Sequence, residues 1–255
     1  VPKQIKFKTK PQIALEQIRW ACESGLPRGV ALMDAAYGRD ARLRAGMTEL
    51  DVPYAVGIVP TILMWAPGSG PRRMDKPMNN TGRRDEPELV SAKKVALGLP
   101  KQAWRTVTWR EGSADQLSSR FARVRVRVGY NKLIPEELSP EWLLIEWPEG
   151  EAEPTEYWLS TLPENVSFTQ LVDLAKLRWR IERDYQELKQ EVGLGHYEGR
   201  GWRGFHHHAT LCIAAYGFLI AEQATIPPSG PRSAAPVEVP PLPDNYRPRG
   251  SARAA

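Results

Sequence analysis

Apolar residues recur at steps of three and four in one stretch of the chain: Leu174, Leu177, Ile181, Tyr185 and Leu188. This is the period of an α-helix with one buried side, so we expect one amphipathic helix here. Ser167, with Gln170 three residues later, has the spacing of a capping box and predicts where that helix begins.

The polar side of this predicted helix carries a carboxylate between two cations. Arg178 precedes Glu182 by four residues, and Lys189 follows it by seven, so all three share one side. One interpretation is that Glu182 binds a divalent metal while Arg178 and Lys189 hold phosphates. The other is a solvated face with i,i+4 ion pairs, which contribute only tenths of a kcal/mol.

The first part of the chain predicts alternating helices and strands. Pro11 begins a helix whose buried stripe comprises Ala14, Ile18, Ala21 and Cys22. The short basic segment 1–10 before it reads as a strand or an extended entry. Residues 30–33 form an apolar run typical of a strand buried on both faces, 39–50 a helix, and 52–59 the next strand. This order favours an α/β fold that starts with a parallel sheet.

Asp34 directly follows the first predicted strand. Open α/β sheets bind ligands at the carboxyl ends of their strands, so this is a position for a catalytic carboxylate. An Asp at the same place also commonly caps the helix that follows.

Residues 65–102 read as loop, and 104–109, 121–128, 142–147 and 156–162 read as strands. In 121–128 the alternation is strict, with valines on one side and Arg123, Arg125 and Arg127 on the other. Such a row of arginines can follow a sugar-phosphate backbone. It can equally pair with Glu149, Glu151 and Glu153. Two interpretations also remain for four arginines of the 65–102 segment: they contact phosphate, or they lie in a solvated polar loop. These are Arg72, Arg73, Arg83 and Arg84.

The end of the chain predicts one helix and a disordered tail. Residues 205–223 are helical in pattern, and the apolar run 209–220 within them is too short to span a bilayer and reads as buried. His206, His207 and His208 are consecutive and therefore point in different directions, which disfavours a joint metal site. Pro, Ser and Ala dominate 225–255, which we expect to be disordered.

Composition narrows the class of protein only slightly. The 255 residues are 42% hydrophobic and 25% charged, with a net charge of +5, which mildly favours a polyanionic partner. The two cysteines, Cys22 and Cys212, lie in separate apolar segments and predict free thiols in a reducing cytosol. We find no secretion leader, and expect no membrane association.

Two motifs together resemble those of insertion-sequence transposases of the DDE superfamily, the branch with a Tyr-x2-Arg-x3-Glu-x6-Lys signature. They are Asp34-Ala35-Ala36-Tyr37-Gly38 and the set Arg178, Glu182 and Lys189, with 193–208 following. The resemblance covers about residues 1–222. It implies a ribonuclease-H-like core in which Asp34 is the second catalytic aspartate and Glu182 the catalytic glutamate. Both would bind Mg²⁺, with Mn²⁺ as a substitute, while Arg178 and Lys189 hold the DNA end.

The resemblance also implies a division of the chain and a set of partners. Residues 1–64 and 167–224 would form the core, 65–166 a loop and a β-rich insertion, and 225–255 the tail. Trp104 and Trp109 of the insertion could stack on a flipped base or belong to the sheet core. The partners would be the terminal repeats of an insertion sequence in double-stranded DNA and a second copy on that DNA, in a prokaryotic cytoplasm near the nucleoid.

The chain departs from the pattern of this family in two places. Ala175 stands where the signature Tyr falls, and residues 1–33 hold no Asp, although the first catalytic aspartate lies on an earlier strand. With Val1 at the start, we interpret the sequence as the C-terminal part of such an enzyme. The alternatives are a DNA-binding remnant without catalysis, a metal-dependent nuclease with the same core, and, least favoured, an interaction protein.

Overall fold

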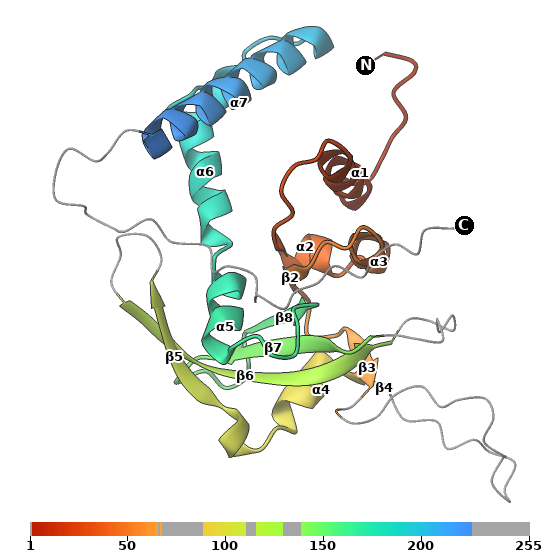
Figure 1. Ribbon diagram of the computed structural model, residues 1–255, viewed down its shortest axis with the longest axis vertical. Helices are drawn as coiled ribbons and strands as arrows, with labels where there is room; N and C mark the ends of the chain where they lie inside the picture. The colour runs from red at the N-terminus through yellow and green to blue at the C-terminus, as the bar shows by residue number, and fades with distance from the viewer. Residues whose placement is uncertain (1, 66, 68–88, 111–115, 130–138, 226–255) are drawn as a thin grey trace, which may run out of the picture. The chain divides into compact units, whose positions relative to one another are not determined.

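The computed structural model describes residues 2–65, 67, 89–110, 116–129 and 139–225 (Figure 1). The chain divides into two compact units, which are described separately. The sheet unit comprises the described residues from 8 to 176. The helical unit comprises residues 2–7 and 177–225.

The helices of the sheet unit are α1 (Lys10–Glu23), α2 (Ala35–Gly38), α3 (Ala41–Glu49), α4 (Ala92–Leu97), the 3₁₀ turn η1 (Lys101–Ala103) and α5 (Phe168–Lys176). Its strands are β1 (Ala31–Met33), β2 (Tyr54–Gly57), β3 (Leu63–Trp65), β4 (Leu89–Ser91), β5 (Arg105–Arg110), β6 (Gln116–Val128), β7 (Glu141–Trp147) and β8 (Glu156–Ser160).

These strands form one mixed sheet in the order β1-β2-β8-β7-β6-β3-β4, with β5 also paired to β6. The pair β1–β2 is parallel, as the alternation of helices and strands predicts, and the other pairs are antiparallel. The strands of the predicted β-rich insertion are continuous with the rest, because β8 pairs directly with β2. A mixed α/β fold with such a sheet is consistent with a ribonuclease-H-like architecture.

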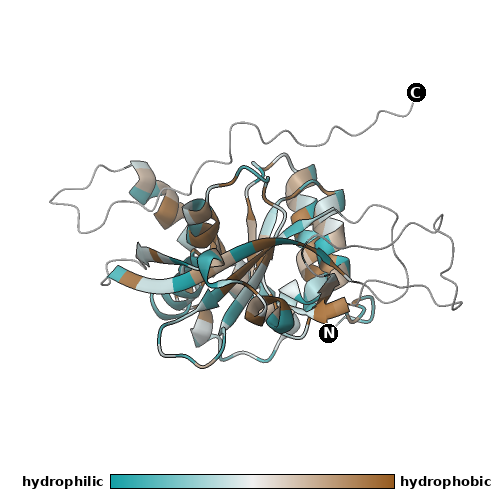
Figure 2. Cartoon of the chain, turned by 90° about the horizontal axis from the view of Figure 1, so that it is seen from below, coloured by the Kyte–Doolittle hydropathy of each residue, from teal (hydrophilic) through white to brown (hydrophobic). Residues whose placement is uncertain are grey.

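Alternate residues of the central strands pack into two separate cores. Leu143, Ile145 and Leu159 face the core beneath α3 and α4, and Leu144 and Trp158 face the core beneath α5. Figure 1 shows α4 and α5 on opposite sides of the sheet, and Figure 2 shows hydrophobic segments concentrated in its middle. The sheet unit is therefore a three-layer structure with its sheet covered on both faces.

The predicted first helix is confirmed. Thr9 caps α1 in a capping box with Gln12, and Gly25 follows it with φ +74°, a conformation that favours glycine. Ala14, Ile18 and Cys22 of the predicted stripe pack against the core and are half-buried. Residues 2–9 contain no strand, which excludes one of the two forms predicted for this segment.

Three expectations about the sheet unit need correction. Residues 89–97 are not loop but β4 and α4, which begins at the Ser91 cap. β1 is half-buried rather than buried on both faces, because it lies at the edge of the sheet. The helix predicted for 39–50 begins at Ala41, because Asp40 caps α3 through the amide of Leu43 and separates it from α2.

The helix predicted from Ser167 onward is two helices. The capping box is confirmed, since the Ser167 and Gln170 side chains each accept the other's backbone N–H. α5 ends at Lys176, and α6 (Trp179–Gln190) begins the helical unit after a turn at 177–178. Arg178 stays near helical dihedrals (φ −56°, ψ −26°), so the apolar spacing continues through the turn and the pattern cannot reveal it.

The helical unit continues with the 3₁₀ turn η2 (Leu194–His196) and α7 (Trp202–Thr225). α7 packs on α6 through Tyr216, whose hydroxyl lies 3.0 Å from Asp184 Oδ1 and 3.1 Å from Glu187 Oε2. Cys212 contacts the segment directly after α6, where its thiol meets the Val192 carbonyl. The prediction of a buried helix at 209–220 is wrong. Cys212 is the one buried residue of α7, since a single helix covers only one of its sides. Among the described helices, none has the length and hydrophobicity needed to cross a membrane.

Candidate active site

Asp34 lies at the carboxyl end of β1 and begins α2. Its Oδ1 accepts the backbone N–H of Ala36 at 2.8 Å and that of Tyr37 at 3.3 Å, so the side chain is the N-cap of the helix. The residue is nevertheless exposed to solvent. Among the described residues nothing donates to Oδ2, so one carboxylate oxygen of Asp34 is available to a ligand.

Gly38, the last residue of the Asp-Ala-x-Tyr-Gly motif, allows α2 to contact the end of β2 directly. A Cβ atom at Gly38 would lie 1.9 Å from the carbonyl oxygen of Gly57. A Cβ at Gly57 would in turn lie 3.1 Å from the Ala35 nitrogen and 3.3 Å from the Asp34 carbonyl carbon. Two glycines therefore fix the backbone that carries Asp34 against the neighbouring strand.

A buried polar cluster lies beneath this turn: Arg44, Tyr54 and Glu141. Arg44 of α3 is 2% exposed and its guanidinium donates to the Gly38 carbonyl, which ties α3 to the end of α2. The Tyr54 hydroxyl donates to Glu141 Oε2 at 2.8 Å. Burial raises the pKa of the Glu141 carboxyl, and the nearby Arg44 and Arg125 charges and the Tyr54 hydrogen bond oppose that rise.

The cluster was not predicted from the sequence, although the position of Arg44 on its helix indicated a buried charge. Arg44 lies between Leu43 and Met47 on the buried side of α3, where a charge needs a buried partner. The identity of the partner was not readable, since Glu141 lies 97 positions further along the chain and meets Arg44 only through the sheet.

Glu182 lies in the first turn of α6 and is exposed over 65% of its side chain. Its Oε1 accepts from Arg178 Nη1 at 2.7 Å, which is the i,i+4 ion pair of the simpler interpretation. Lys189, predicted on the same side, has its Nζ over the Tyr185 ring at 5.4 Å from the centroid. Among the described residues nothing donates to Glu182 Oε2.

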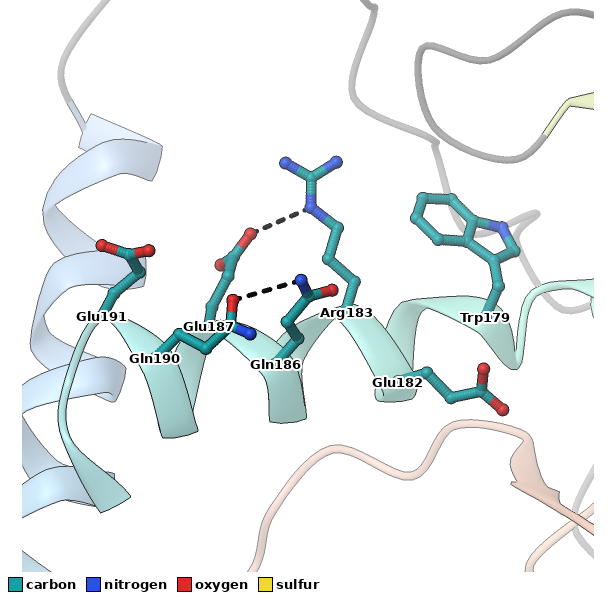
Figure 3. A pocket seen from close by; sticks show the side chains of 7 residues that line it. All are labelled: Trp179, Glu182, Arg183, Gln186, Glu187, Gln190 and Glu191. Carbon is teal, nitrogen blue, oxygen red and sulfur yellow. Dashed lines mark hydrogen bonds and ion pairs between the residues drawn. The ribbon is translucent and has the colours of Figure 1, made fainter. Parts of the chain in front are cut away.

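A pocket of about 530 Å³ lies along α6, and its lining residues in the described part of the chain come from this helix and its C-cap, Glu191 (Figure 3). In Figure 3 the Glu182 carboxylate points away from Arg183, which pairs with Glu187 at 2.9 Å between Nε and Oε1. Carboxylates and amides dominate this lining: Glu182, Glu187, Glu191, Gln186 and Gln190. No three of the described carboxylates here are grouped closely enough to hold a metal ion by themselves.

The arginine row of β6 is present, and it makes contacts within the sheet unit. Arg123 donates to the Val166 carbonyl at 2.7 Å and stacks over the Trp142 ring at 4.4 Å. Arg125 stacks over the same ring and lies 3.6 Å from Glu164 Oε1, and burial lowers its pKa. Arg127 is half-buried. The acid on this face is Glu164 rather than the predicted Glu149, Glu151 or Glu153, and Glu153 pairs with Lys93 instead.

Trp104 and Trp109 are half-buried side chains of the sheet unit. Trp104 meets Trp147 edge to face at 5.3 Å between centroids, and Trp109 meets Phe121 likewise at 5.6 Å. Lys176 Nζ lies 4.9 Å from the Trp109 centroid. Both rings thus pack beside the core, in line with the alternative that they belong to the sheet core. Stacking on a DNA base remains a prediction for each.

The structure places Asp34 in the sheet unit and Glu182 in the helical unit, so the geometry of each carboxylate is known separately. The DNA-binding candidates divide likewise, with Arg178 and Lys189 in the helical unit and the β6 arginines in the sheet unit. Within the described residues no three His, Cys, Asp or Glu side chains are grouped closely enough to hold a metal ion.

Comparison with known proteins gives a match over the first part of the chain. Residues 1–116 match the family model described as DDE superfamily endonuclease, a match that includes Asp34 and ends before Glu182. No curated protein matches the chain. The family match supports a nuclease or transposase of the DDE superfamily, a class of enzymes that act on DNA.

Proposed function

We propose that the chain is part of a DNA transposase that cuts and joins DNA strands at the ends of an insertion sequence. The observation that carries this proposal is Asp34, an exposed carboxylate with one available oxygen at the carboxyl end of a parallel strand, inside the matched family region. Glu182, exposed on α6 with one available oxygen, is the proposed second carboxylate.

Asp34 and Glu182 fit Mg²⁺ by the chemistry of their donors, since hard oxygen ligands suit this ion and Mn²⁺ can replace it. Two such ions, when bound, would supply an activated water or 3′-hydroxyl and a stabilised leaving oxygen at the phosphodiester. In the proposal, the free oxygens of Asp34 and Glu182 hold the ions. The Asp34 backbone is fixed by its cap and by the Gly38–Gly57 contact, which limits the movement of that ligand.

DNA contact is assigned to the cationic side chains near these carboxylates in sequence. Arg178 and Lys189 are the proposed contacts to the DNA end, and a homodimer on the terminal repeats is part of the proposal. Arg123, Arg125 and Arg127 are proposed as weaker contributors, because the first two already donate or stack within the sheet unit. The net charge of +5 is consistent with a DNA partner.

The second candidate is a DNA-binding remnant without catalysis. It is favoured by the complete structural roles that both carboxylates have without metal, Asp34 as a helix cap and Glu182 as the partner of Arg178. We expect DNA binding with little or no cleavage from these 255 residues, because the resemblance requires a third carboxylate and residues 1–33 hold no Asp. Efficient Mg²⁺- or Mn²⁺-dependent nicking of DNA bearing insertion-sequence ends would contradict that expectation.

The test is Mn²⁺ binding, followed by electron paramagnetic resonance, in the wild type and in Asp34→Asn. Asn caps helices as well as Asp does, so this change removes the charge and keeps the fold. Asp40→Asn is the matched control, because Asp40 caps α3 in the same way. We expect Mn²⁺ affinity to fall more than about tenfold, or ~1.4 kcal/mol, in Asp34→Asn alone.

Glu182→Gln tests the other carboxylate, with Glu191→Gln on the same helix as its control. The proposal expects weaker Mn²⁺ binding in Glu182→Gln and wild-type binding in Glu191→Gln. Equal Mn²⁺ affinity in wild type, Asp34→Asn and Glu182→Gln would overturn the metal-binding role and leave the DNA-binding remnant.

A further inference from the structure

The outward side of α7 is apolar and has no partner within the described part of the chain. Residues 204–221 contain no Asp, Glu, Lys or Arg. Large side chains along this stretch are open to solvent: Leu211 57%, Ile213 58%, Phe218 63% and Ile220 44%. A helix that is apolar on all sides is normally buried, so this surface is expected to pack against another protein surface.

The contacts of α7 with α6 and with the residues directly after it, Val192 and Gly193, define which side faces outward. His208, Cys212 and Tyr216 follow one another at four-residue steps and make these contacts. The opposite side is a line of small residues at steps of four, three and four: Thr210, Ala214, Gly217 and Ala221. All four are exposed, and a Cβ at Gly217 would meet nothing within 4 Å among the described atoms.

Two ridges of large side chains flank the line of small residues. Leu211 and Phe218 are seven residues apart on one flank, and Ile213 and Ile220 are seven apart on the other. Steps of four and three with flanking residues at seven are the repeat of two helices that pack side by side. Small residues in the centre allow two backbones to approach closely, while the ridges interlock beside them.

We propose that this face of α7, the line of small residues with its two ridges, pairs with the same face of a second copy of the chain. A face without charges meets its own copy without like-charge repulsion, and a two-fold pair buries both copies at once. The two ridges and the small residues between them offer on the order of 500 Å² per copy. Two copies together would bury about 1,000 Å², which is the lower limit for a specific interface.

This pairing needs neither DNA nor metal, so it stands apart from the proposed chemistry. The experiment is sedimentation velocity of the complete chain over a range of concentrations, without DNA or divalent cations. We expect twice the chain mass at micromolar concentrations for the wild type. A wild type that stays monomeric at high concentration overturns the proposal, whether α7 is covered by another part of its own chain or by another protein.

Ala214→Glu places a charge in the centre of the proposed seam and should give a monomer. Gln223→Glu adds the same charge to α7 about half a helical turn away from the seam and should leave the dimer intact. A dimer that persists in Ala214→Glu would place the interface elsewhere.

Ala214→Cys provides a readout that does not depend on weakening the pair. Two copies joined along the seam should form an intermolecular disulfide on mild oxidation, and Gln223→Cys should not. Circular dichroism verifies that each variant keeps its helices. Equal cross-linking of the two cysteine variants would contradict the proposed face.

Discussion

The two proposed catalytic carboxylates lie in surroundings of opposite kind. Asp34 stands on a turn fixed by close contacts: its own cap, the Gly38–Gly57 approach, and the buried Arg44 that donates to Gly38. Glu182 stands on a helix with no buried residue, and α7 beside it buries only Cys212. Within the described residues, the sheet unit thus buries the surroundings of its carboxylate, and the helical unit leaves much of its apolar surface uncovered.

This difference concerns how firmly each carboxylate is positioned by its own unit. Contacts within the sheet unit determine the backbone of Asp34. The position of Glu182 depends on a short helix pair held by a few side-chain contacts, among them the hydrogen bonds of Tyr216 to Asp184 and Glu187. We therefore expect mutations to act on folding in the sheet unit and on association in the helical unit.

The largest difference in stability between the two units should come from replacing one phenylalanine by alanine in each of them. Phe121 of β6 is fully buried, so Phe121→Ala should lower the free energy of unfolding by about 3–5 kcal/mol. Phe218 of α7 is 63% exposed, so Phe218→Ala should change it by less than about 0.5 kcal/mol. Chemical unfolding followed by circular dichroism, at concentrations that dissociate the α7 pair, measures both. Equal losses in the two variants would contradict the contrast.

A smaller contrast should come from two glycines. Gly38→Ala forces a Cβ into the Gly57 carbonyl and should destabilise the protein by about 3 kcal/mol, the upper end of the overpacking range. Gly217→Ala meets no neighbour and should stabilise α7 by about 0.5–1 kcal/mol, because alanine favours helix. At concentrations that dissociate the α7 pair, the midpoint of thermal unfolding should fall for Gly38→Ala and rise for Gly217→Ala. A Gly38→Ala protein of wild-type stability would show that α2 does not need its close contact with β2.

The smallest expected effect depends on pH and belongs to the sheet unit. Burial raises the pKa of the Asp173 carboxyl on α5. A raised folded-state pKa gives stability that is complete below about pH 3.9 and is lost as the pH rises through that raised value. Asp173→Asn should therefore gain stability relative to wild type between about pH 3 and pH 7, as measured by urea unfolding at several pH values. Parallel stability curves for the two proteins would contradict the role of burial.

The sequence predicted local elements well, for a physical reason. Apolar period and cap residues act within a few positions, so the helix beginning near Pro11, the capping box of Ser167 with Gln170 and the alternation of β6 could all be recognised in advance. Asp34 was placed correctly at the end of its strand, and its capping role was one of the two predicted alternatives.

Features that depend on distant partners were missed. The Arg44–Glu141 cluster joins residues far apart in sequence, and β4 and α4 are short elements inside a polar stretch. The break before α6 preserves the helical period, so no pattern could reveal it. Exposure of α7 was mispredicted because an apolar run shows that a surface needs covering and does not show which molecule covers it.

The cap at Asp34 has a consequence for how this position can vary among related sequences. Folding alone needs a short side chain whose oxygen accepts from Ala36 and Tyr37, which Ser, Thr and Asn also supply. Metal binding alone needs a carboxylate, which Glu also supplies. Only Asp satisfies both demands. If a related protein no longer needed to cut DNA, substitutions of Asp34 by Asn, Ser or Thr would be tolerated, because the fold would be kept. Substitution at position 34 would then be an earlier sign of lost activity than substitutions in the core of the sheet.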